Sequence, residues 1–434
     1  MKIISITTVK NEADIIESFI RYHLNIVDEM IILNNGSTDD TNFILNQLLN
    51  ENLQITVIDD KDKYFKPVEK MNFLMKKAIQ EFNADIVCPI DVDEFITSEY
   101  GNPRKYIEKI DKHTYYKIKW RTYVPTKEDN IHEKFIPAKM TYMRDENLEE
   151  YKVIVHKNLF YEFDASLTVG SHELQYDRKQ YGNTVKCEIC DDLIMAHFPL
   201  RSKEQTISKV LVSYPNLLCR IEVNPNLGFH KSHYAPMFFK IKNEGNVSEK
   251  VVLDFAKRYS TKGNEVDKDE EIKIIEKPMN FKFCKNLDIK YDFTLNPLSN
   301  VLEHYTYLAK EVNKFKKEKI NETKKIEIFN KKLEKLNNEN WKYAQKINNQ
   351  PDTIQNNKLL IEISKLNTEI SKYKIEISKL KNELNKYNNM GDLVNINDYK
   401  NTIDVLISKN QNQEESIRKL IDENNMLKNK INRK

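Results

Sequence analysis

The first 100 residues alternate between short apolar runs and amphipathic stretches. The apolar runs predict four buried strands, over Lys2–Val9, Glu29–Leu33, Leu53–Ile58 and Ile86–Ile90. The amphipathic stretches predict three helices, from Asn11 to Leu24, from Thr38 to Asn50 and over Pro67–Phe82. Strands that alternate with helices are typical of the α/β class. We therefore expect a mostly parallel, Rossmann-like sheet with helices on both faces.

Residues 101–240 have a different pattern. They are rich in Tyr, Phe, His and Arg, and strand-like runs at Tyr115–Val124 and Tyr151–Phe160 predict an antiparallel extension of the sheet. Residues 241–300 are charged and weakly patterned. We therefore predict one domain over 1–240, with halves at 1–100 and 101–240, followed by a helical or irregular connector over 241–300.

From residue 301 to residue 434 the apolar positions follow heptads. One core position holds Ile363, Ile370, Ile377 and Leu384, and the other holds Leu366, Tyr373, Leu380 and Tyr387. Ile at the first position with Leu at the second favours a parallel two-stranded coiled coil, and hence a dimer. A weaker block precedes this one over 308–347, and another follows over 403–431 with Asn410 and Asn424 at core positions. The phase changes near Pro351 and Gly391, which predicts three helical segments. The alternatives are a single amphipathic helix folded back on the globular domain, or disorder.

Charge separates the same two regions. Residues 1–300 hold 42 Lys+Arg and 47 Asp+Glu, whereas residues 301–434 hold 27 and 19, and the whole chain has a net charge of +3. The basic residues of the C-terminal region alternate with Glu and Asn, which is typical of the solvated faces of a coil. The chain is therefore not expected to be a dedicated nucleic-acid binder.

The sequence contains no apolar run of about 18 residues, so no transmembrane helix is expected. The N-terminus lacks the apolar segment and cleavage site of a signal peptide, and five Cys do not form a disulfide framework. We expect a cytoplasmic protein, either free or peripheral at the inner face of a membrane.

Polar clusters follow the predicted strands at 8–12, 34–41 and 91–94, and the carboxyl ends of parallel strands meet at one edge of a sheet. The sharpest cluster is Asp91-Val92-Asp93, which is bracketed by apolar residues. Two carboxylates at a strand end can hold Mg²⁺ or Mn²⁺ and leave open positions for phosphate oxygens. His197 follows an apolar run and could complete the metal shell. The cations Arg201 and Lys209 come shortly after it and could face a diphosphate.

In combination, several stretches of the first 215 residues resemble the family 2 glycosyltransferases with the GT-A fold. The matching stretches are Thr7–Glu12, Ile31–Thr41, Lys70–Asn72, Ile90–Phe95 and Ala196–Gln205. The chain departs from the pattern at position 34, where the family usually has an Asp that contacts the nucleotide base. Asn34 keeps an acceptor but loses the charge, which leaves the identity of the base open.

The resemblance implies roles for particular residues. Thr8, Lys10, Glu12 and Asn34 would line the nucleoside pocket, and Lys70 would reach the phosphate or the base. Asp91 would bind ribose or metal, and Asp93 would bind metal. Each of these residues could instead be a helix cap or a surface polar group.

The resemblance also implies inversion, which requires a base that deprotonates the acceptor hydroxyl. Glu173 in the stretch Gly170–Glu173 is the first candidate, and Asp191 and Asp192 are the second; the sequence leaves both open.

The function that we expect is transfer of a sugar from a nucleotide-sugar, with UDP as the expected nucleotide, to a hydroxyl group. The acceptor would be a glycan, a lipid-linked molecule or a protein. The usual context of such enzymes is synthesis of surface polysaccharide, glycolipid or glycoprotein. The alternatives are a nucleotidyltransferase with a similar acidic metal site, and a non-catalytic coiled-coil scaffold that carries a degenerate enzyme domain.

Overall fold

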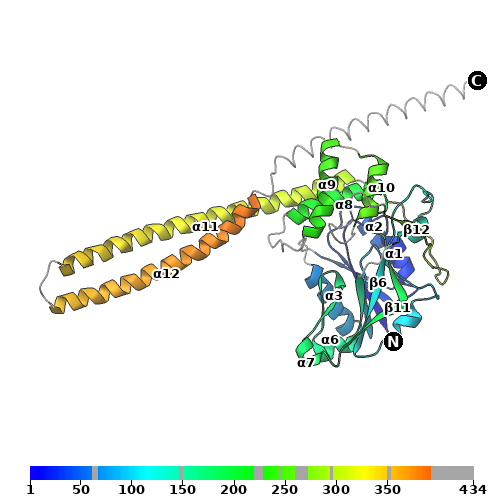
Figure 1. The fold of residues 1–434 in the computed structure, drawn as a ribbon, viewed down its shortest axis with the longest axis horizontal. Coiled ribbons are helices and arrows are strands. Elements are labelled where there is room, and N and C mark those ends of the chain that lie inside the picture. The colour runs from blue at the N-terminus through cyan, green and yellow to red at the C-terminus, as the bar shows by residue number, and fades with distance from the viewer. Residues whose placement is uncertain are drawn as a thin grey trace, which may run out of the picture. The chain divides into compact units, whose positions relative to one another are not determined.

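The computed structural model describes residues 1–60, 67–145, 150–218, 228–244, 247–259, 272–293, 297–348 and 353–391 (Figure 1). The chain divides into two compact units. The first unit comprises Met1–Ser213 and Gly228–Val301, and the second comprises Tyr214–Leu227 and Leu302–Lys434. Each unit is described by itself.

An eight-stranded sheet is the centre of the first unit, with the order β3-β2-β1-β4-β8-β6-β11-β5. In that order the strands are β3 (Ile55–Asp59), β2 (Glu29–Asn34), β1 (Ile3–Val9), β4 (Ile86–Pro89), β8 (Tyr151–His156), β6 (Thr114–Thr122), β11 (Lys186–His197) and β5 (Glu94–Thr97). The first four strands are parallel to one another, and β8 joins β4 and β6 in antiparallel fashion. β11 is parallel to β6 and antiparallel to β5. The predicted α/β class and the antiparallel extension are therefore confirmed.

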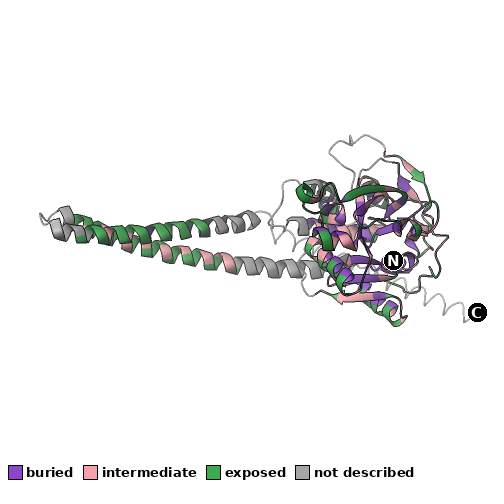
Figure 2. Ribbon diagram, turned by 90° about the horizontal axis from the view of Figure 1, so that it is seen from below, coloured by how far each residue is buried: buried purple, intermediate pink, exposed green. Residues whose placement is uncertain are grey.

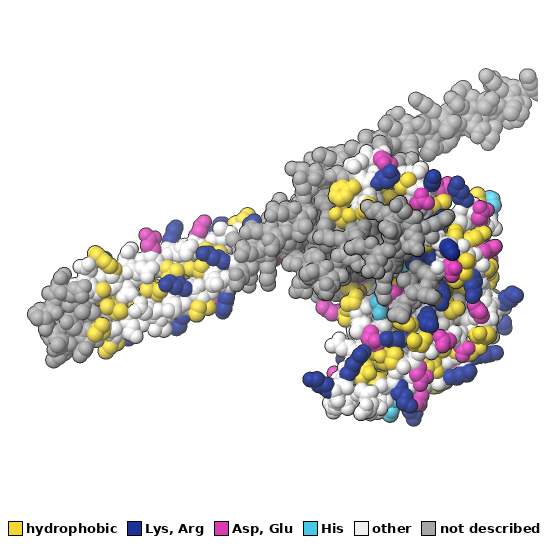
Figure 3. Space-filling model, in the orientation of Figure 1, with side chains coloured by type: hydrophobic (Ala, Val, Ile, Leu, Met, Phe, Trp, Pro, Cys, Tyr) yellow, Lys and Arg dark blue, Asp and Glu magenta, His cyan; other side chains and the backbone are white. Residues whose placement is uncertain are grey.

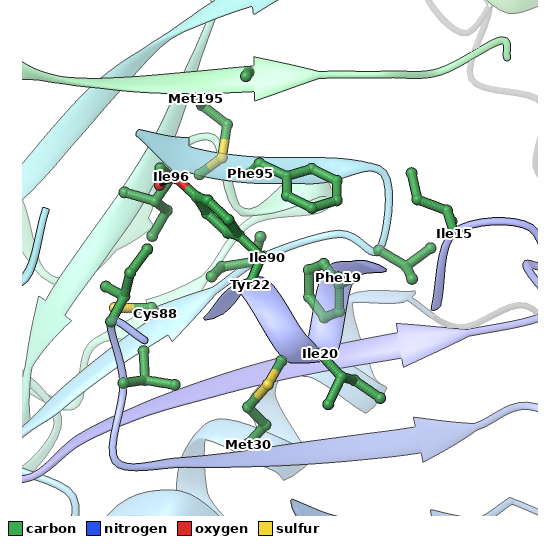
Figure 4. Packing of buried hydrophobic residues seen from close by; sticks show 14 of the residues in the cluster. Ile15, Phe19, Ile20, Tyr22, Met30, Cys88, Ile90, Phe95, Ile96 and Met195 are labelled. Carbon is green, nitrogen blue, oxygen red and sulfur yellow. Dashed lines mark hydrogen bonds between the residues drawn. The ribbon is translucent and has the colours of Figure 1, made fainter. Parts of the chain in front are cut away.

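Helices cover both faces of this sheet. The helices α1 (Ile16–His23) and α2 (Thr41–Asn50) pack on one face, and α3 (Pro67–Gln80) and α6 (Lys157–Phe163) pack on the other. On the first face the rings of Phe19 and Phe95 meet edge to face at 6.1 Å, and the hydroxyl of Tyr22 donates to the carbonyl of Ile96 at 2.8 Å (Figure 4). Burial of these aromatic rings fixes α1 against the strand that follows Asp93.

The remaining elements belong to the first unit, apart from residues 214–218 at the end of one helix, which belong to the second. They are α4 (Arg104–Ile107), α5 (Ile136–Lys139), β7 (Tyr142–Arg144), β9 (Ser166–Leu167), η1 (Val169–Ser171), β10 (Leu174–Gln175), α7 (Arg178–Tyr181), α8 (Lys203–Leu218), α9 (Gly228–Glu244), α10 (Glu249–Arg258) and β12 (Ile274–Glu276). The strand β12 pairs with β7, and Phe281 and Phe283 pack against the core of the first face. Part of the segment predicted as a connector is therefore integrated into the first unit.

The second unit contains two long helices, α11 (Pro297–Asn348) and α12 (Thr353–Gly391), which lie side by side and antiparallel (Figures 1 and 2). The rings of Phe329 and Tyr373 are 5.4 Å apart, and the amide of Asn340 donates to that of Asn367 at 2.7 Å. Among the α12 side chains whose burial the structure describes, Ile370, Ile377 and Leu380 are the most buried, at 6–7% exposed.

The least exposed positions of α12 are thus the predicted heptad positions, and they face α11 of the same chain. The parallel dimer predicted from these heptads stays a prediction, and the heptads over 403–431 lie outside the described residues. None of the described helices is long and apolar enough to span a membrane. On the face shown in Figure 3, cationic and anionic side chains are interspersed over the described surface of both units.

Candidate active site

The polar segments that follow β1 and β2 meet at the carboxyl edge of the sheet, as the sequence predicted. Asn11 adopts a left-handed conformation with φ of 56°, and its side-chain carbonyl accepts from the backbone of Thr38 at 2.7 Å. The backbone of Glu12 donates to the hydroxyl of Thr41 at 2.9 Å, and that of Ala13 donates to Asp39 at 3.1 Å. The predicted cluster at 34–41 thus braces the loop that carries Glu12.

Asp93, His197 and Lys209 form the centre of the site. The ammonium of Lys209 on α8 lies 3.1 Å from Oδ2 of Asp93, and Nε2 of His197 at the end of β11 lies 3.8 Å from the same oxygen. Burial tends to raise the pKa of Asp93, but Lys209 and His197 outweigh it and hold that pKa below its usual range. Burial lowers the pKa of His197 to about 4, so its imidazole is neutral at physiological pH.

Arg201 anchors the chain beside this centre. Its guanidinium is 2% exposed and donates to both carboxylate oxygens of Asp14, at 2.7 and 2.8 Å, and also to Glu12. Burial raises the pKa of Glu12 above its usual range, although Arg201 and Lys209 oppose this shift. Arg201 therefore ties the loop after β1 to the loop after β11 through a bidentate pair.

Asp91 lies beside a second buried cation. The ammonium of Lys152 on β8 is 2.5 Å from Asp91 and 3.1 Å from Glu94. Lys152 is 1% exposed and Glu94 is fully buried, whereas the side chain of Asp91 is 45% exposed. Burial tends to lower the pKa of Lys152, but Asp91 and Glu94 outweigh it and raise that pKa. Lys152 therefore neutralises the carboxylates that flank Asp93.

An aromatic stack forms the floor next to His197. The indole of Trp120 on β6 stacks on the His197 ring at 4.5 Å with an angle of 28° between the planes. The same indole also contacts the ring of His172, edge to face, with the ring centroids 5.1 Å apart. Trp120 thus connects His172 to the centre around Asp93.

The predicted nucleoside residues lie at the ends of β1, β2 and β3. Thr8 and Lys10 lie at the end of β1, partly exposed. Lys70 donates to Asn35 at 2.8 Å and pairs with Asp60 at 2.5 Å. The amide of Asn34 donates to Asp59 at 3.1 Å, so a carboxylate at the end of β3 lies next to the position where the family usually has Asp. Lys70 and Asp59 line a hollow of about 380 Å³ between these strand ends.

The predicted bases lie apart from the contacts described above. Glu173 accepts from Tyr115 at 2.5 Å and from Lys117 at 2.6 Å. Burial tends to raise the pKa of Glu173, but these two partners outweigh it and lower that pKa. Asp191 and Asp192 lie exposed on β11, where Asp191 is 3.5 Å from Lys119.

The donor atoms of Asp93 and His197 suit a divalent cation. An ionised carboxylate and a neutral imidazole are good ligands for Mn²⁺, and Nδ1 of His197 is buried without a hydrogen-bond partner in the described part of the chain. Asp91 contacts Lys152 instead, and the described residues contain no cluster of three His, Cys, Asp or Glu arranged to hold a metal. The residues therefore fit a cation that has two protein ligands and whose other ligands come from water or substrate.

The sequence analysis missed four residues that the fold brings to this site. They are Asp14, Asp59, Glu94 and Lys152. Lys152 had a signal, since it is a single charge within the β-branched strand Tyr151–His156. Glu94 directly follows Asp93 and lies within the matching stretch Ile90–Phe95, but the sequence assigned it no role of its own.

Three solved structures illustrate what the chain is similar to, and no curated protein matches its sequence. TarS residues 1–349 from S. aureus are 18% identical, with 54% of this chain and 69% of that chain covered and a TM-score of 0.31. GalNAc-T7, solved with UDP, GalNAc and Mn²⁺, is 9% identical, with 58% and 56% covered and a TM-score of 0.30. Glucosyl-3-phosphoglycerate synthase from Mycobacterium tuberculosis is 13% identical, with 45% and 71% covered and a TM-score of 0.25. At such TM-scores the likenesses carry no argument about this chain.

The family comparison gives a firmer result. The model of the glycosyl transferase family 2 matches residues 5–166, which include the loop after β1, the Asp91-Val92-Asp93 motif and Lys152. The predicted resemblance is confirmed over this range, since residues 5–166 match the model of the glycosyl transferase family 2.

Proposed function

We propose that this protein transfers a sugar from a nucleotide-sugar, linked to UDP, to a hydroxyl group with inversion at the anomeric carbon. The observation that carries the proposal is the contact of Asp93 with Lys209 and His197, where Asp93 belongs to the stretch 5–166 that matches the glycosyl transferase family 2 model. An ionised, buried carboxylate beside a neutral imidazole can bind a divalent cation. That cation and the neighbouring ammonium can then bind the diphosphate.

The nucleotide would lie along the carboxyl ends of β1, β2 and β3. Lys70 and Asp59 line the hollow that would take the base, and Thr8, Lys10, Glu12 and Asn34 lie at the neighbouring loops. Such a placement leads the diphosphate toward the ends of β4 and β11, where Asp93, His197 and Lys209 are found. Ligands in open α/β sheets bind at this edge.

A divalent metal, Mn²⁺ or Mg²⁺, would be held by Asp93 and His197, with Asp91 available on the exposed side of Lys152. When bound, such a metal stabilises the negative charge of the departing diphosphate. The chain itself would supply Lys209 for the same charge, because its ammonium lies 3.1 Å from Asp93 and its side chain keeps 21% of its surface exposed. Arg201 holds Glu12 and Asp14 away from the anion by pairing with both.

The acceptor would be a glycan, a lipid-linked molecule or a protein, in the synthesis of surface polysaccharide, glycolipid or glycoprotein. We further propose that the protein acts in the cytoplasm, in part at the inner face of a membrane, and that its C-terminal heptads join two copies. Sedimentation of the full chain and of a chain that ends near residue 300 tests the last point. An unchanged oligomeric state would contradict it.

Calorimetry of UDP binding in the presence of Mn²⁺ tests the nucleotide and metal proposal. The wild type should bind UDP more tightly with Mn²⁺ than with EDTA, and Asp93→Ala should lose this difference. The variant Asp191→Ala is the control, because Asp191 is an exposed carboxylate away from the site. If the wild type binds no UDP with or without Mn²⁺, the proposed function is wrong. A thermal-shift screen of nucleotide-sugars then identifies the donor.

A further inference from the structure

His172 occupies a turn whose backbone is shaped around it. The 3₁₀ turn η1 precedes it, and within η1 both Gly170 and Ser171 have positive φ, at 67° and 54°. A Cβ added to Gly170 would collide with Nε2 of the His172 ring. Only glycine suits position 170, because the left-handed backbone and the close approach of the imidazole both disfavour a side chain. The turn therefore fixes the position of the ring.

The hydrogen bonds of His172 define its tautomer. Nδ1 lies 2.7 Å from the backbone carbonyl of Tyr151, and a carbonyl oxygen can only accept. Nδ1 therefore carries a proton, and Nε2 of the neutral ring is left with a free electron pair. Within the described ranges, Nε2 has no hydrogen-bond partner, and the residue is partly exposed to solvent. Burial, together with the charge of Lys152, lowers the pKa of His172 below its usual range, so the ring is neutral at pH 7.

The ring also lies near the proposed metal and diphosphate site. His172 and His197 both contact the indole of Trp120, and His197 is the imidazole nearest to Asp93. The charges that act on His172 come from Lys152 and Glu150 on and beside β8, and from Asp91 after β4. Asp91 and Lys152 belong to the group of charged residues around Asp93, so His172 lies at the edge of this group. Trp120 lies between the rings of His172 and His197.

We propose that Nε2 of His172 is the general base that deprotonates the acceptor hydroxyl. The inference rests on the proposed function and names a residue for its missing step. Nε2 takes the hydroxyl proton as the acceptor oxygen forms a bond to the anomeric carbon. The bond from that carbon to the diphosphate oxygen breaks, and its electron pair leaves with the nucleoside diphosphate. The imidazolium then gives its proton to solvent.

Glu173, the neighbouring residue, is less suited to this step. Both of its carboxylate oxygens accept hydrogen bonds, from Tyr115 and Lys117, and these partners hold its pKa below its usual range. A base works best with a pKa near the working pH and with a free electron pair that reaches the substrate. Of His172 and Glu173, only His172 has an acceptor atom, Nε2, that accepts no hydrogen bond from the described residues.

The variant His172→Asn tests the proposal, because the Asn amide can still donate to the carbonyl of Tyr151 but offers no basic nitrogen. The assay measures release of UDP from UDP-glucose, UDP-galactose and UDP-N-acetylglucosamine with water as the acceptor, and calorimetry measures UDP binding with Mn²⁺. We expect binding as in the wild type and a rate of release that falls by about 100-fold or more. The variant His113→Asn is the control, since His113 is an exposed imidazole that pairs with Glu162 elsewhere in the unit.

Two further readouts separate a base from a structural residue. The wild-type rate should fall as the medium is acidified through the pKa of His172, and this decline should be absent in His172→Asn. In His172→Ala, added imidazole should restore part of the rate, whereas it should leave the His113→Ala rate unchanged. Release at the wild-type rate by His172→Asn would overturn the proposal. If the wild type binds UDP but releases it from none of the three donors, the donor class is wrong, and the base assignment falls with it. If it binds no UDP, the proposed function itself has failed.

Discussion

Lys152 provides the most direct test of the electrostatics beneath the Asp91-Val92-Asp93 motif. Its ammonium is 1% exposed and contacts Asp91 at 2.5 Å and the fully buried Glu94 at 3.1 Å. The substitution Lys152→Met keeps the length of the side chain and removes its charge. Loss of one partner of a buried ion pair costs about 3–5 kcal/mol, because the remaining group must either stay charged without compensation or take up a proton. We expect the free energy of unfolding to fall by this amount at pH 8.

The pH dependence of this loss has a defined sign. Burial raises the pKa of Glu94 well above its usual range, although Lys152 opposes the shift. In Lys152→Met the opposing charge is gone, so the folded state holds a proton on Glu94 that the unfolded chain has released. Stability then decreases as the pH rises above the unfolded pKa, by at most about 1.4 kcal/mol per pH unit. Buried imidazoles such as His197 change the stability of both proteins in the opposite sense, so the prediction concerns the loss relative to the wild type. That loss should be larger at pH 8 than at pH 5.

Urea unfolding followed by circular dichroism at pH 5 and pH 8 measures both effects. The control is Lys157→Met, because Lys157 pairs with Asp85 at 2.6 Å on the surface, and such pairs contribute at most about 1 kcal/mol. The double variant Lys152→Met/Glu94→Gln should recover part of the lost free energy of unfolding. Its loss relative to the wild type should also change less between pH 5 and pH 8. The reasoning is refuted if Lys152→Met costs less than about 1 kcal/mol at pH 8, or if its loss of stability relative to the wild type becomes smaller from pH 5 to pH 8.

Three other predictions concern the metal centre and the helical hairpin. Asp93→Asn should bind Mn²⁺ at least about 10-fold more weakly than the wild type in calorimetry, because the variant loses the ionised ligand, and Asp191→Asn should behave as the wild type. Lys209→Ala should bind Mn²⁺ alone more tightly, measured by electron paramagnetic resonance, because an ammonium 3.1 Å from Asp93 no longer repels the cation. Ile370→Asp should lower the melting temperature of the helical signal by several degrees, whereas Ile361→Asp should leave it nearly unchanged, since these side chains are 6% and 57% exposed.

The parallel half of the sheet could be predicted from the sequence, because its signals are local. Apolar β-branched runs of five to seven residues form β1, β2 and β3, and the polar clusters that follow β1 and β2 meet where parallel strands end. The antiparallel half was predicted only in outline. The run from Tyr151 continues as a strand only to His156, whose side chain accepts from the backbone of Asn158 and begins a helix at Lys157.

The heptads show a different limit of sequence reasoning. The pattern identifies the buried positions of α12 correctly, since Ile370, Ile377 and Leu380 are the most buried of its described side chains. It does not identify the helix that covers them. In the structure α11 of the same chain lies along this face, and its Phe329 ring is 5.4 Å from the ring of Tyr373. A heptad repeat requires a partner helix, and the loop decides whether that partner belongs to the same chain.

The sequence by itself determined the α/β class, the family match over residues 5–166, and the position of Asp93 at the end of a strand. Only the tertiary structure decided which charges neutralise one another. Lys152 lies 61 residues from Asp91, Arg201 lies 187 residues from Asp14, and Lys209 lies 116 residues from Asp93. Sequence periodicity reports which face of one element is buried, whereas an ion pair depends on the register between strands that are distant in the chain. The register of β8 brings Lys152 to Asp91, whereas the packing of α8 and of the turn η1 brings Lys209 to Asp93 and His172 to Trp120.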